Sequence, residues 1–591
     1  MINNEIPLSQ SVRIQPKNKI VITVIGESGV GKTSFLNSLI FSSNTVNQRQ
    51  VQTLGLDMRS LILFLIVWIF HISSSHKCRH DLFMNRTLIN VDSQIQTRPY
   101  LLSSESETHS YDIYIDYDSI NVWGSGNNQL ISKIKIALGY VSEAFSKILS
   151  VSESVLFKFE DDTLLKRCDS SIITSSTLKK GVVADMVIIP LIVPQEQLGE
   201  NVIAAAGACA FANKLNNRPA VGVVYLGSKI SFDKDNSMVY ASHILLHELT
   251  HALVFSPILF SYFPSQPAYK NVTWQGQKKT LVITPKVVEV ARKYYGCDTL
   301  EGVELEDQGG QGSALAHWES RIMLGDYMIS TDFQERAISE ITLALFEDSG
   351  WYQVNYNLTG GLFRFGKNEG CQFLENLCIV NEQSYFPREF CTESRANRCM
   401  TGHTSKGFCY LVSGLDIPIQ YRYFTDPSKG GFPAADYCPV VVPTTISSTT
   451  SYFGSHCKHG ENNTLPQSLG DYLGSNSVCI ESSLTKKDDI TVSEYKGKIT
   501  PKCHQIECNY ETNSFSINVT NITFVCDQKG KILTHSDFDG QLACPDFERV
   551  CPESQNFCNE LFDCLGIPIS SSFYKLNIVI LSVITLFLFG S

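Results

Sequence analysis

The sequence lacks an excess of basic charge. Lysine and arginine number 48 against 59 aspartates and glutamates, which gives a net charge of −11 at pH 7. Proteins that grip nucleic acid phosphates carry a basic patch or stripe, so we do not expect a nucleic acid partner. Apolar residues make up 43% of the chain, enough for a sizeable buried core, and a length of 591 residues predicts several domains.

Cysteine is absent before Cys78 and abundant later. The chain has 19 cysteines, and sixteen of them lie between Cys297 and Cys564. Their irregular spacing matches no zinc-finger pattern, which favours a disulfide framework made in an oxidising compartment. Six Asn-x-Ser/Thr sequons, all after Cys78, are typical of a glycosylated secretory protein. The sequons begin at Asn85, Asn271, Asn357, Asn462, Asn518 and Asn521.

The apolar run at residues 61–70 (LILFLIVWIF) is shorter than the roughly 20 residues that a membrane-spanning helix needs. It follows Met58 and Arg59 and precedes three serines. A basic start, an apolar middle and a small polar end predict a signal peptide over residues 58–75. A buried strand or helix is the alternative for this run.

A phosphate-binding loop pattern, GESGVGKT, precedes the signal peptide. The backbone at Gly26 and Gly31 would wrap phosphate oxygens, Lys32 would reach the outer phosphates and Thr33 would bind Mg²⁺. Residues 1–57 resemble the start of a Rab-type small GTPase and predict a P-loop α/β fragment. The later runs that read the γ-phosphate and guanine in that family are missing, so we do not expect GTP and Mg²⁺ as cofactors.

These two N-terminal patterns belong to different compartments. A P-loop works with nucleotide in the cytosol, whereas the cysteines and sequons belong to the secretory lumen. The GTPase likeness stops at Asp57, and the next residue, Met58, opens the signal peptide. We expect the working protein to begin at Met58, with residues 1–57 joined to it by an error of gene prediction or a recent fusion. A signal anchor that leaves them in the cytosol is the alternative.

Strand-like and helical segments alternate through the middle of the chain. Apolar residues recur every three or four positions from Asn128 to Leu149, as on a helix with one buried face. Short apolar runs such as Ile113–Ile115, Val187–Val193 and Val221–Tyr225 predict strands. After Cys371 the sequence is rich in Cys, Ser, Thr and Gly, which predicts a disulfide-stapled region of strands and loops.

The segment ASHILLHELTHALVFS, residues 241–256, carries the pattern that points to chemistry. His247 and His251 are four residues apart on an apolar helix, so both imidazoles project from one face about one turn apart. This spacing suits two ligands of one Zn²⁺, and Glu248 could take a proton from water without being a ligand. A pair of core histidines on a buried helix is the alternative.

A catalytic zinc site needs a third protein ligand and one open position. The metzincin pattern would place Gly three residues after the second histidine, but Val254 stands there, and the next histidine is His317. We expect the neighbouring Trp318 to pack in the core, with substrate contact as the alternative. We expect Glu319 to be a surface carboxylate, with orientation of a zinc ligand as the alternative.

Together these segments resemble the leishmanolysin-type surface metallopeptidases, which are metzincins with a long insertion before the third zinc histidine. The resemblance runs from about His76 to Gly566. It includes HKCRHD around Cys78, the segment 241–256, the His317-Trp318-Glu319 run, the LALFEDSGWY segment that begins at Leu343, and the cysteine-rich tail.

The resemblance implies an α+β metzincin-like fold and one catalytic Zn²⁺. It implies His247, His251 and His317 as zinc ligands, Glu248 as the catalytic residue, and Met328 as the methionine of the turn under the zinc. Val254 replaces the family's Gly; a left-handed turn there would cost a β-branched residue about 1–2 kcal/mol, unless the helix runs on.

Cys78 would be the thiolate that blocks the open zinc position before activation, because a thiolate is a strong zinc ligand. An ordinary disulfide partner is the alternative. Removing Cys78 from the 19 cysteines leaves 18, an even number that can pair fully.

The apolar tail Leu576–Phe589 predicts a membrane anchor, either a lipid-anchor signal or a short spanning helix. The expected segments are a P-loop fragment (1–57), a signal peptide (58–75), a propeptide-like segment (76–99), an N-terminal catalytic subdomain (100–255), a central subdomain with the third zinc ligand (256–370), a Cys-rich domain (371–570) and the anchor tail (571–591).

The implied function is a zinc metalloendopeptidase that cleaves proteins or peptides at the cell surface or in the secretory and endocytic pathway, with a further role in cell adhesion. The alternatives are an inactive adhesion glycoprotein of the same fold and a nucleotide-binding protein that uses the P-loop.

Overall fold

The computed structural model describes residues 87–551 apart from short gaps, together with His80 and two short strands, β1 (Ile14–Gln15) and β2 (Lys19–Ile20). The gaps are residues 100–107, 121–127, 200–201, 228–229, 231–236, 275, 311, 332–334, 359–362, 444–454, 459–469 and 475. The predicted P-loop with Gly26, Gly31, Lys32 and Thr33, the signal peptide, Cys78 and the apolar tail lie outside the described residues.

A five-stranded sheet forms the centre of the first subdomain, the part of the described chain that ends with α8 (Ser237–Leu253). Its order is β3 (Ile89–Asn90), β11 (Ala204–Ala212), β12 (Arg218–Gly227), β10 (Met186–Val193) and β6 (Ile113–Ile115). β10 is parallel to both β6 and β12, whereas β11 is antiparallel to β12. β10 and β12 are buried along their whole length, which explains their nearly unbroken apolar sequences.

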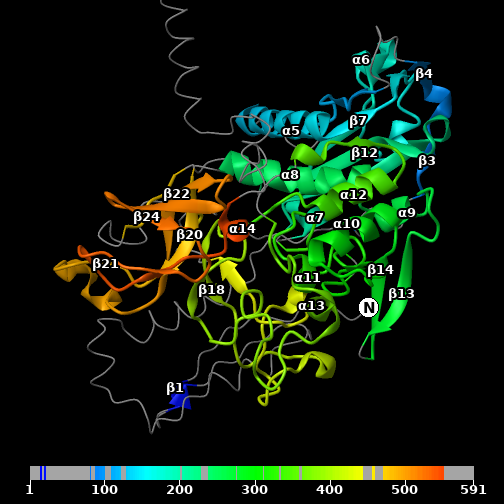
Figure 1. Cartoon of the computed structure of the whole chain (residues 1–591). Helices are drawn as coiled ribbons and strands as arrows, with labels where there is room; N and C mark the ends of the chain where they lie inside the picture. Colours follow the sequence, from blue (N-terminus) through cyan, green and yellow to red (C-terminus); the bar gives the residue numbers. More distant parts are fainter. Residues whose placement is uncertain are drawn as a thin grey trace, which may run out of the picture.

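Two long helices cover one face of this sheet (Figure 1). α5 (Asn128–Ile148) packs on α8 (Ser237–Leu253), and α8 lies across β11 and β12. Within β10, Met186 and Ile188 join the core on the helix side, whereas Val187 and Ile189 join the core on the opposite face. This alternation is the period of two of a strand, so the sheet separates two apolar layers.

The opposite face of the sheet is covered by a smaller antiparallel sheet and loops. Its strands are β4 (Ile95–Pro99), β8 (Glu153–Phe157) and β9 (Val182–Ala184). Val155, Phe157 and Phe159 fill the layer between the two sheets. The short helices α6 (Ser176–Lys180) and α7 (Gln195–Leu198) flank this layer.

The second subdomain follows α8. An antiparallel sheet contains β13 (Tyr269–Trp274), β14 (Gln277–Val282) and β15 (Val303–Leu305). Its helices are α9 (Pro257–Phe260), α10 (Pro285–Tyr295), α11 (Ser320–Met323) and α12 (Glu340–Asp348), and α10 packs against α12. β5 (His109–Ser110), β7 (Leu149–Val151) and β16 (Gln353–Val354) form a small sheet that joins it to the first subdomain.

The Cys-rich region consists of strands and loops, as predicted. It opens with α13 (Cys371–Glu375) and a sheet of β17 (Asn397–Cys399), β18 (Lys406–Cys409) and β19 (Val441–Pro443). A six-stranded antiparallel sheet follows, and α14 (Phe547–Val550) ends the described chain. Its strands, in sheet order, are β24 (Ile522–Cys526), β23 (Ser514–Val519), β22 (Thr500–Asn509), β20 (Ser477–Ser482), β27 (Leu542–Ala543) and β25 (Ile532–Leu533).

Eight disulfides pair sixteen of the cysteines, which confirms the predicted framework. They are Cys168–Cys209, Cys297–Cys371, Cys378–Cys438, Cys391–Cys409, Cys399–Cys479, Cys457–Cys503, Cys508–Cys551 and Cys526–Cys544. Cys78, Cys558 and Cys564 lie outside the described residues.

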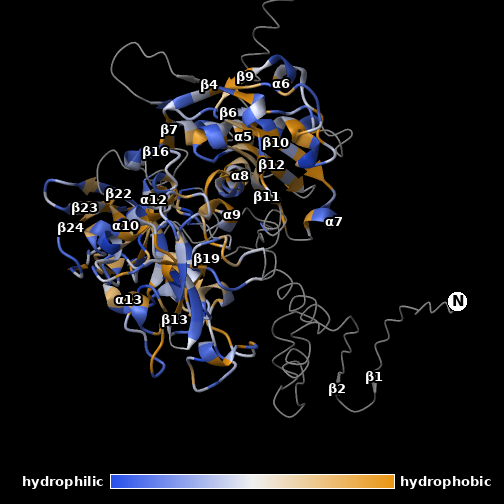
Figure 2. Cartoon of the chain, turned by 90° about the vertical axis from the view of Figure 1, so that its right-hand side faces the viewer, coloured by the Kyte–Doolittle hydropathy of each residue, from blue (hydrophilic) through white to orange (hydrophobic). Residues whose placement is uncertain are grey.

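Apolar residues concentrate in the strands of the central sheet and in α8, with hydrophilic residues on the outer loops (Figure 2). Within the described residues, the segment Met238–Phe260 is long and apolar enough to cross a membrane, with a mean hydropathy of 1.3. Because 89% of it is buried inside the molecule, it serves as the core helix that carries the HELTH pattern.

Candidate metal centre

The core helix α8 and a later loop bring three histidines together. His251 and His317 are fully buried and His247 is 8% exposed. His317 lies in the loop between β15 and α11. That loop is held in place because the N–H of Glu306 donates to the carbonyl of His317 at 2.9 Å. The predicted pairing of α8 with a distant third histidine is therefore present in the structure.

The Nε2 atoms of the three histidines converge on one point. Nε2 of His247 lies 3.2 Å from Nε2 of His251 and 3.2 Å from Nε2 of His317. Two nitrogens that bind one tetrahedral zinc at about 2.0 Å are separated by about 3.3 Å. The spacing of the three nitrogens therefore fits a single metal ion, and these residues form a cluster that could hold one.

The other ring nitrogen of each histidine contacts a main-chain carbonyl. Nδ1 of His247 lies 2.7 Å from the oxygen of Tyr327. The corresponding distances are 2.8 Å from His251 to Phe255 and 2.8 Å from His317 to Ser313. A carbonyl oxygen can only accept, so Nδ1 carries the hydrogen and Nε2 keeps its lone pair for a metal.

His251 has its pKa well below the ordinary value for histidine. Burial is the largest cause, followed by the nearby rings of His80, His247 and His317. A neutral imidazole is the form that binds metals. The environment of His251 therefore favours the ligating form over the imidazolium.

Glu248 is completely buried next to His247. Its Oε2 accepts a hydrogen bond of 3.0 Å from the main-chain N–H of Ala206, on β11. This contact fixes the carboxylate between α8 and the sheet. The residue is thus held close to the histidine cluster, as a proton acceptor in a metallopeptidase site requires.

Met328 lies in a tight turn directly after Tyr327, whose carbonyl contacts His247. It is fully buried, its N–H donates to Oδ1 of Asp326 at 2.7 Å, and its carbonyl accepts from the N–H of Trp318 at 3.0 Å. The preceding residue, Tyr327, supplies the carbonyl that orients His247 and donates or accepts a 2.9 Å hydrogen bond with Thr250. The turn therefore supports the metal centre from the side of the second subdomain.

The position that departs from the metzincin pattern carries no strain. Val254 does not have a positive φ, and its N–H donates to the carbonyl of Thr250 at 2.9 Å. This bond closes the last turn of α8, which ends at Leu253, and the N–H of Phe255 donates to the same carbonyl at 2.9 Å as the chain leaves the helix. The left-handed turn that would disfavour valine is not formed.

The predictions for Trp318 and Glu319, the two residues after His317, have different outcomes. Trp318 is fully buried, stacks edge-on with Phe255 at 4.8 Å and donates from Nε1 to Thr342, which confirms its predicted role in packing. The predicted surface position of Glu319 is wrong, because this side chain is fully buried. Its Oε1 accepts from the N–H of Arg321 and caps α11.

One residue of the propeptide-like segment lies against the metal centre. The ring of His80 stacks on that of His251 with 4.4 Å between centroids, and its Nε2 lies 2.9 Å from Oγ of Ser256. His80 is two residues after Cys78. His80 is therefore in direct contact with one of the candidate ligands.

Sequence reasoning missed a buried acidic cluster next to this centre. Lys279 forms ion pairs there with Glu304, Asp307 and Asp436. The run Glu304-Leu305-Glu306-Asp307 was a visible signal of dense acidic charge. The carbonyl oxygens that orient the histidines had no such signal, because any residue type supplies a carbonyl.

The sequence of this chain is similar to those of known proteins. The family profile described as leishmanolysin, peptidase M8, matches residues 154–559. The chain is 31% identical to leishmanolysin of Leishmania major over 377 residues, 62% of this chain and 59% of that protein. It is 29% identical to the leishmanolysin-like peptidase of Caenorhabditis elegans over 425 residues, 60% of this chain and 62% of that protein. The chain spans about three fifths of the length of these relatives.

The matched region contains α8, the loop with the third histidine, the turn with Met328 and most of the Cys-rich region. The resemblance read from the HELTH pattern and the segments around it is thereby confirmed at the level of the family. This chain belongs to the leishmanolysin family of peptidases.

Proposed function

We propose that this chain is a zinc-dependent metalloendopeptidase that hydrolyses peptide bonds in protein substrates. The observation that carries the proposal is the convergence of three Nε2 atoms at 3.2 Å beside Glu248. Each of these histidines has its Nδ1–H directed to a main-chain carbonyl. Family membership supports the same assignment.

In this proposal, His247, His251 and His317 would hold one Zn²⁺, since three protein ligands are typical of catalytic zinc sites. A bound zinc ion supplies Lewis acidity, which polarises the scissile carbonyl and lowers the pKa of water. Glu248 accepts the proton of the attacking water and then delivers it to the leaving amine. The hydrogen bond from Ala206 holds the Glu248 carboxylate in one orientation during both transfers.

The test is the Glu248→Ala variant of the full chain. Because Glu248 is a proton acceptor and not a ligand, the variant should retain zinc and lose casein hydrolysis by at least about a hundredfold. Zinc is measured by inductively coupled plasma mass spectrometry on the same sample as the assay. Residual activity above a few per cent of wild type would refute the role of Glu248.

Glu289→Ala is the matched control. Glu289 lies on α10 with 70% of its side chain exposed, and it pairs only with Lys286 among the described residues. This substitution removes the same carboxylate from a surface helix, so zinc content and hydrolysis should both stay at wild-type values. A comparable loss in both variants would point to a general effect on folding.

An inactive adhesion glycoprotein of the same fold is the competing proposal. The departure at Val254 was its one supporting feature in the sequence. Val254 adopts ordinary helical hydrogen bonding without a positive φ, so it gives no reason to expect a distorted centre. Activity of wild type that depends on Glu248 would rule out the inactive form.

We also propose that the protein travels the secretory pathway to the cell surface, where a lipid anchor or a single helix holds it in the membrane. Eight disulfides support an oxidising compartment. Asn271, Asn357 and Asn521 are exposed sequon residues to which glycans could be attached. Mobility shift on glycosidase treatment of cell-surface protein tests this route.

A further inference from the structure

Five carboxylates and one lysine meet in the second subdomain, near but separate from the three histidines. The residues are Lys279 on β14, Glu304 on β15, Glu306 and Asp307 just after β15, Glu319 at the start of α11, and Asp436 from the Cys-rich region. All except Asp307 are buried, and the side chain of Asp307 is 23% exposed. The cluster therefore connects the interior with solvent through Asp307.

Lys279 neutralises one side of the cluster. Its Nζ lies 2.7 Å from Glu304, 2.8 Å from Asp436 and 3.0 Å from Asp307. Burial lowers the pKa of Lys279, but the carboxylates of Glu304 and Asp436 more than offset this and raise the pKa above its ordinary value. Lys279 is thus a permanent ammonium, and it occupies the space between Glu304 and Asp436.

A second group of carboxylates lies beside Lys279. Oxygens of Glu306, Asp307 and Glu319 lie within 4.8 Å of one another. Glu306 accepts from the N–H of Gln308 at 2.8 Å and from Oγ of Ser330 at 2.9 Å. These donors hold the Glu306 carboxylate in place and leave lone pairs on both of its oxygens.

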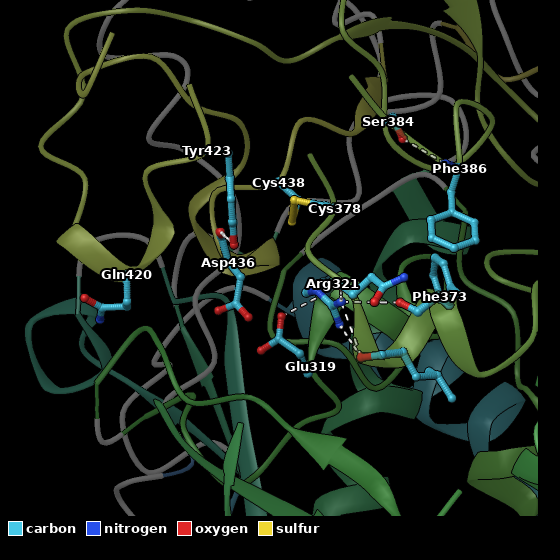
Figure 3. Close-up of a disulfide and its surroundings, with 12 residues drawn as sticks. Glu319, Arg321, Phe373, Cys378, Ser384, Phe386, Gln420, Tyr423, Asp436 and Cys438 are labelled. Atoms are coloured by element: carbon cyan, nitrogen blue, oxygen red, sulfur yellow. Dashed lines mark hydrogen bonds between the residues drawn. A yellow bond between two sulfur atoms is a disulfide. The ribbon is translucent and has the colours of Figure 1, made fainter. Parts of the chain in front are cut away.

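One carboxylate oxygen of Glu319 has no hydrogen-bond donor near it in the described part of the chain. Glu319 is fully buried, and its Oε2 has no hydrogen-bond partner among the residues that the structure describes. Figure 3 shows the carboxylates of Glu319 and Asp436 turned toward each other. A buried carboxylate oxygen without a donor is costly, so its orientation into an acidic cluster points to a cation between these groups.

The cluster contains more carboxyl groups than basic side chains. Five carboxylates face Lys279, the one basic side chain that pairs with them in the described part of the chain. The guanidinium of Arg321 instead donates to the carbonyls of Phe373, Leu374 and Asn376.

We propose that Glu306, Asp307 and Glu319 bind one Ca²⁺ ion. The donors are all carboxylate oxygens, which suit a hard cation, whereas zinc prefers nitrogen and sulfur. Calcium accepts six to eight oxygens in flexible geometry, so water that enters along Asp307 can complete the shell. This proposal does not rest on the peptidase assignment.

The site would link two regions of the molecule. Glu306, Asp307 and Glu319 surround the loop that carries His317, while Lys279 connects them to Asp436 in the Cys-rich region. Gln308 adds a second link, because its Nε2 donates to Asp436 at 2.8 Å. Calcium would stabilise this junction, since an ion that binds only the folded state raises the free energy of unfolding.

The experiment uses the full chain, freed of calcium on a chelating resin and with zinc restored. Calcium titrated by isothermal calorimetry should bind with a stoichiometry of one. Asp307→Asn and Glu306→Gln should each weaken calcium binding by about tenfold or more, because affinity depends on the number of charged ligands. Absence of binding to wild type, or equal affinity in wild type and both variants, would overturn the proposal.

Glu507→Gln is the matched control, because Glu507 is an exposed carboxylate on β22, away from the cluster. It should bind calcium as wild type does. Zinc content is measured on every sample, so loss of the histidine centre is distinguished from loss of calcium.

Terbium gives an independent measurement. The hydroxyl of Tyr421 lies 3.4 Å from Oδ2 of Asp307, so excitation of tyrosine should sensitise Tb³⁺ luminescence, and calcium should quench it by displacement. Tyr421→Phe should reduce the signal without weakening calcium binding. Displacement by magnesium at the same concentration as calcium would overturn the assignment to calcium.

Discussion

At the scale of single residues, the rings of the three candidate ligands are oriented by the same kind of contact. Each Nδ1–H is directed to a main-chain oxygen, namely that of Tyr327, Phe255 or Ser313. Main-chain oxygens are positioned by the fold, so the orientation of the rings tolerates side-chain substitution at these three partners. The ligands themselves have no such tolerance, because no other side chain can place Nε2 at the same point.

His317→Ala should lower zinc content. The substitution reduces three protein ligands to two, and removal of a ligand from such a site weakens metal binding strongly. Zinc per chain, measured after dialysis against metal-free buffer, should fall well below that of wild type. His535→Ala is the control, since His535 is a partly exposed residue of the Cys-rich region. Unchanged zinc stoichiometry in His317→Ala would place the third ligand elsewhere.

His504 on β22 should make stability depend on pH. Burial, together with the nearby charge of Lys502, lowers its pKa to about 4, whereas histidine in an unfolded chain titrates near 6.5. Between these values the unfolded chain binds a proton that the folded chain does not. Stability should therefore fall as the pH drops from about 6.5 to about 4, by about 3 kcal/mol in total.

The measurement is the midpoint of guanidinium unfolding across this pH range. His504→Gln should flatten the dependence, because glutamine does not titrate, while His535→Gln should leave it unchanged. Lys502 contributes in a different window, since its pKa is lowered to about 8. Parallel curves for wild type and His504→Gln would contradict the assignment.

At the scale of elements, helical periodicity predicted the long helix with one buried face, and short apolar runs predicted the strands. The expected helix over Asn128–Leu149 is α5, and the expected strands are β6, β10 and β12. The HELTH pattern placed His247 and His251 on α8 because spacing along a helix is local information. Family likeness supplied His317, since no local rule connects it with α8.

Glu319 shows what the sequence could not reveal. A glutamate next to a tryptophan is usually exposed, and its burial follows from three distant elements, β14, β15 and the loop with Asp436, that close over it. The metzincin pattern has Gly at the position of Val254, and strain was expected there only if the chain makes a left-handed turn at that residue. α8 instead ends at Leu253 without a left-handed residue at position 254, and the pattern alone does not contain that information.

A further prediction concerns Cys78 in the propeptide-like segment. His80, two residues after Cys78 in the sequence, stacks on His251, and we propose that the Cys78 thiolate blocks the open position before activation. Cys78→Ser should make the unprocessed chain active, since a hydroxyl is a much poorer zinc ligand than a thiolate. Casein hydrolysis is compared before and after limited proteolysis. A Cys78→Ser precursor as silent as wild type would contradict this role.

At the scale of the whole molecule, disulfides are distributed by the kind of core they support. The first subdomain contains large apolar layers on both faces of its sheet and one disulfide, Cys168–Cys209. In the Cys-rich region, residues 373–442 join the large core, residues 478–551 form a smaller core of their own, and the region has most of the cross-links. Small cores rarely supply enough free energy alone, so cross-links compensate by restricting the unfolded chain.

The loop length of each disulfide should therefore determine its contribution. Cys399–Cys479 joins β17 to β20 across a sequence separation of 80, whereas Cys391–Cys409 closes a loop of 18. Restriction of the unfolded chain predicts about 4–5 kcal/mol for the first and about 3 kcal/mol for the second. Paired Cys→Ala variants of each disulfide, compared by guanidinium unfolding of the zinc-loaded chain, measure the difference. Both pairs are buried or nearly so, so the lost packing is similar and the difference reports loop length. A larger loss from the short loop would show that local strain or packing, and not restriction of the unfolded chain, determines how these disulfides stabilise the region.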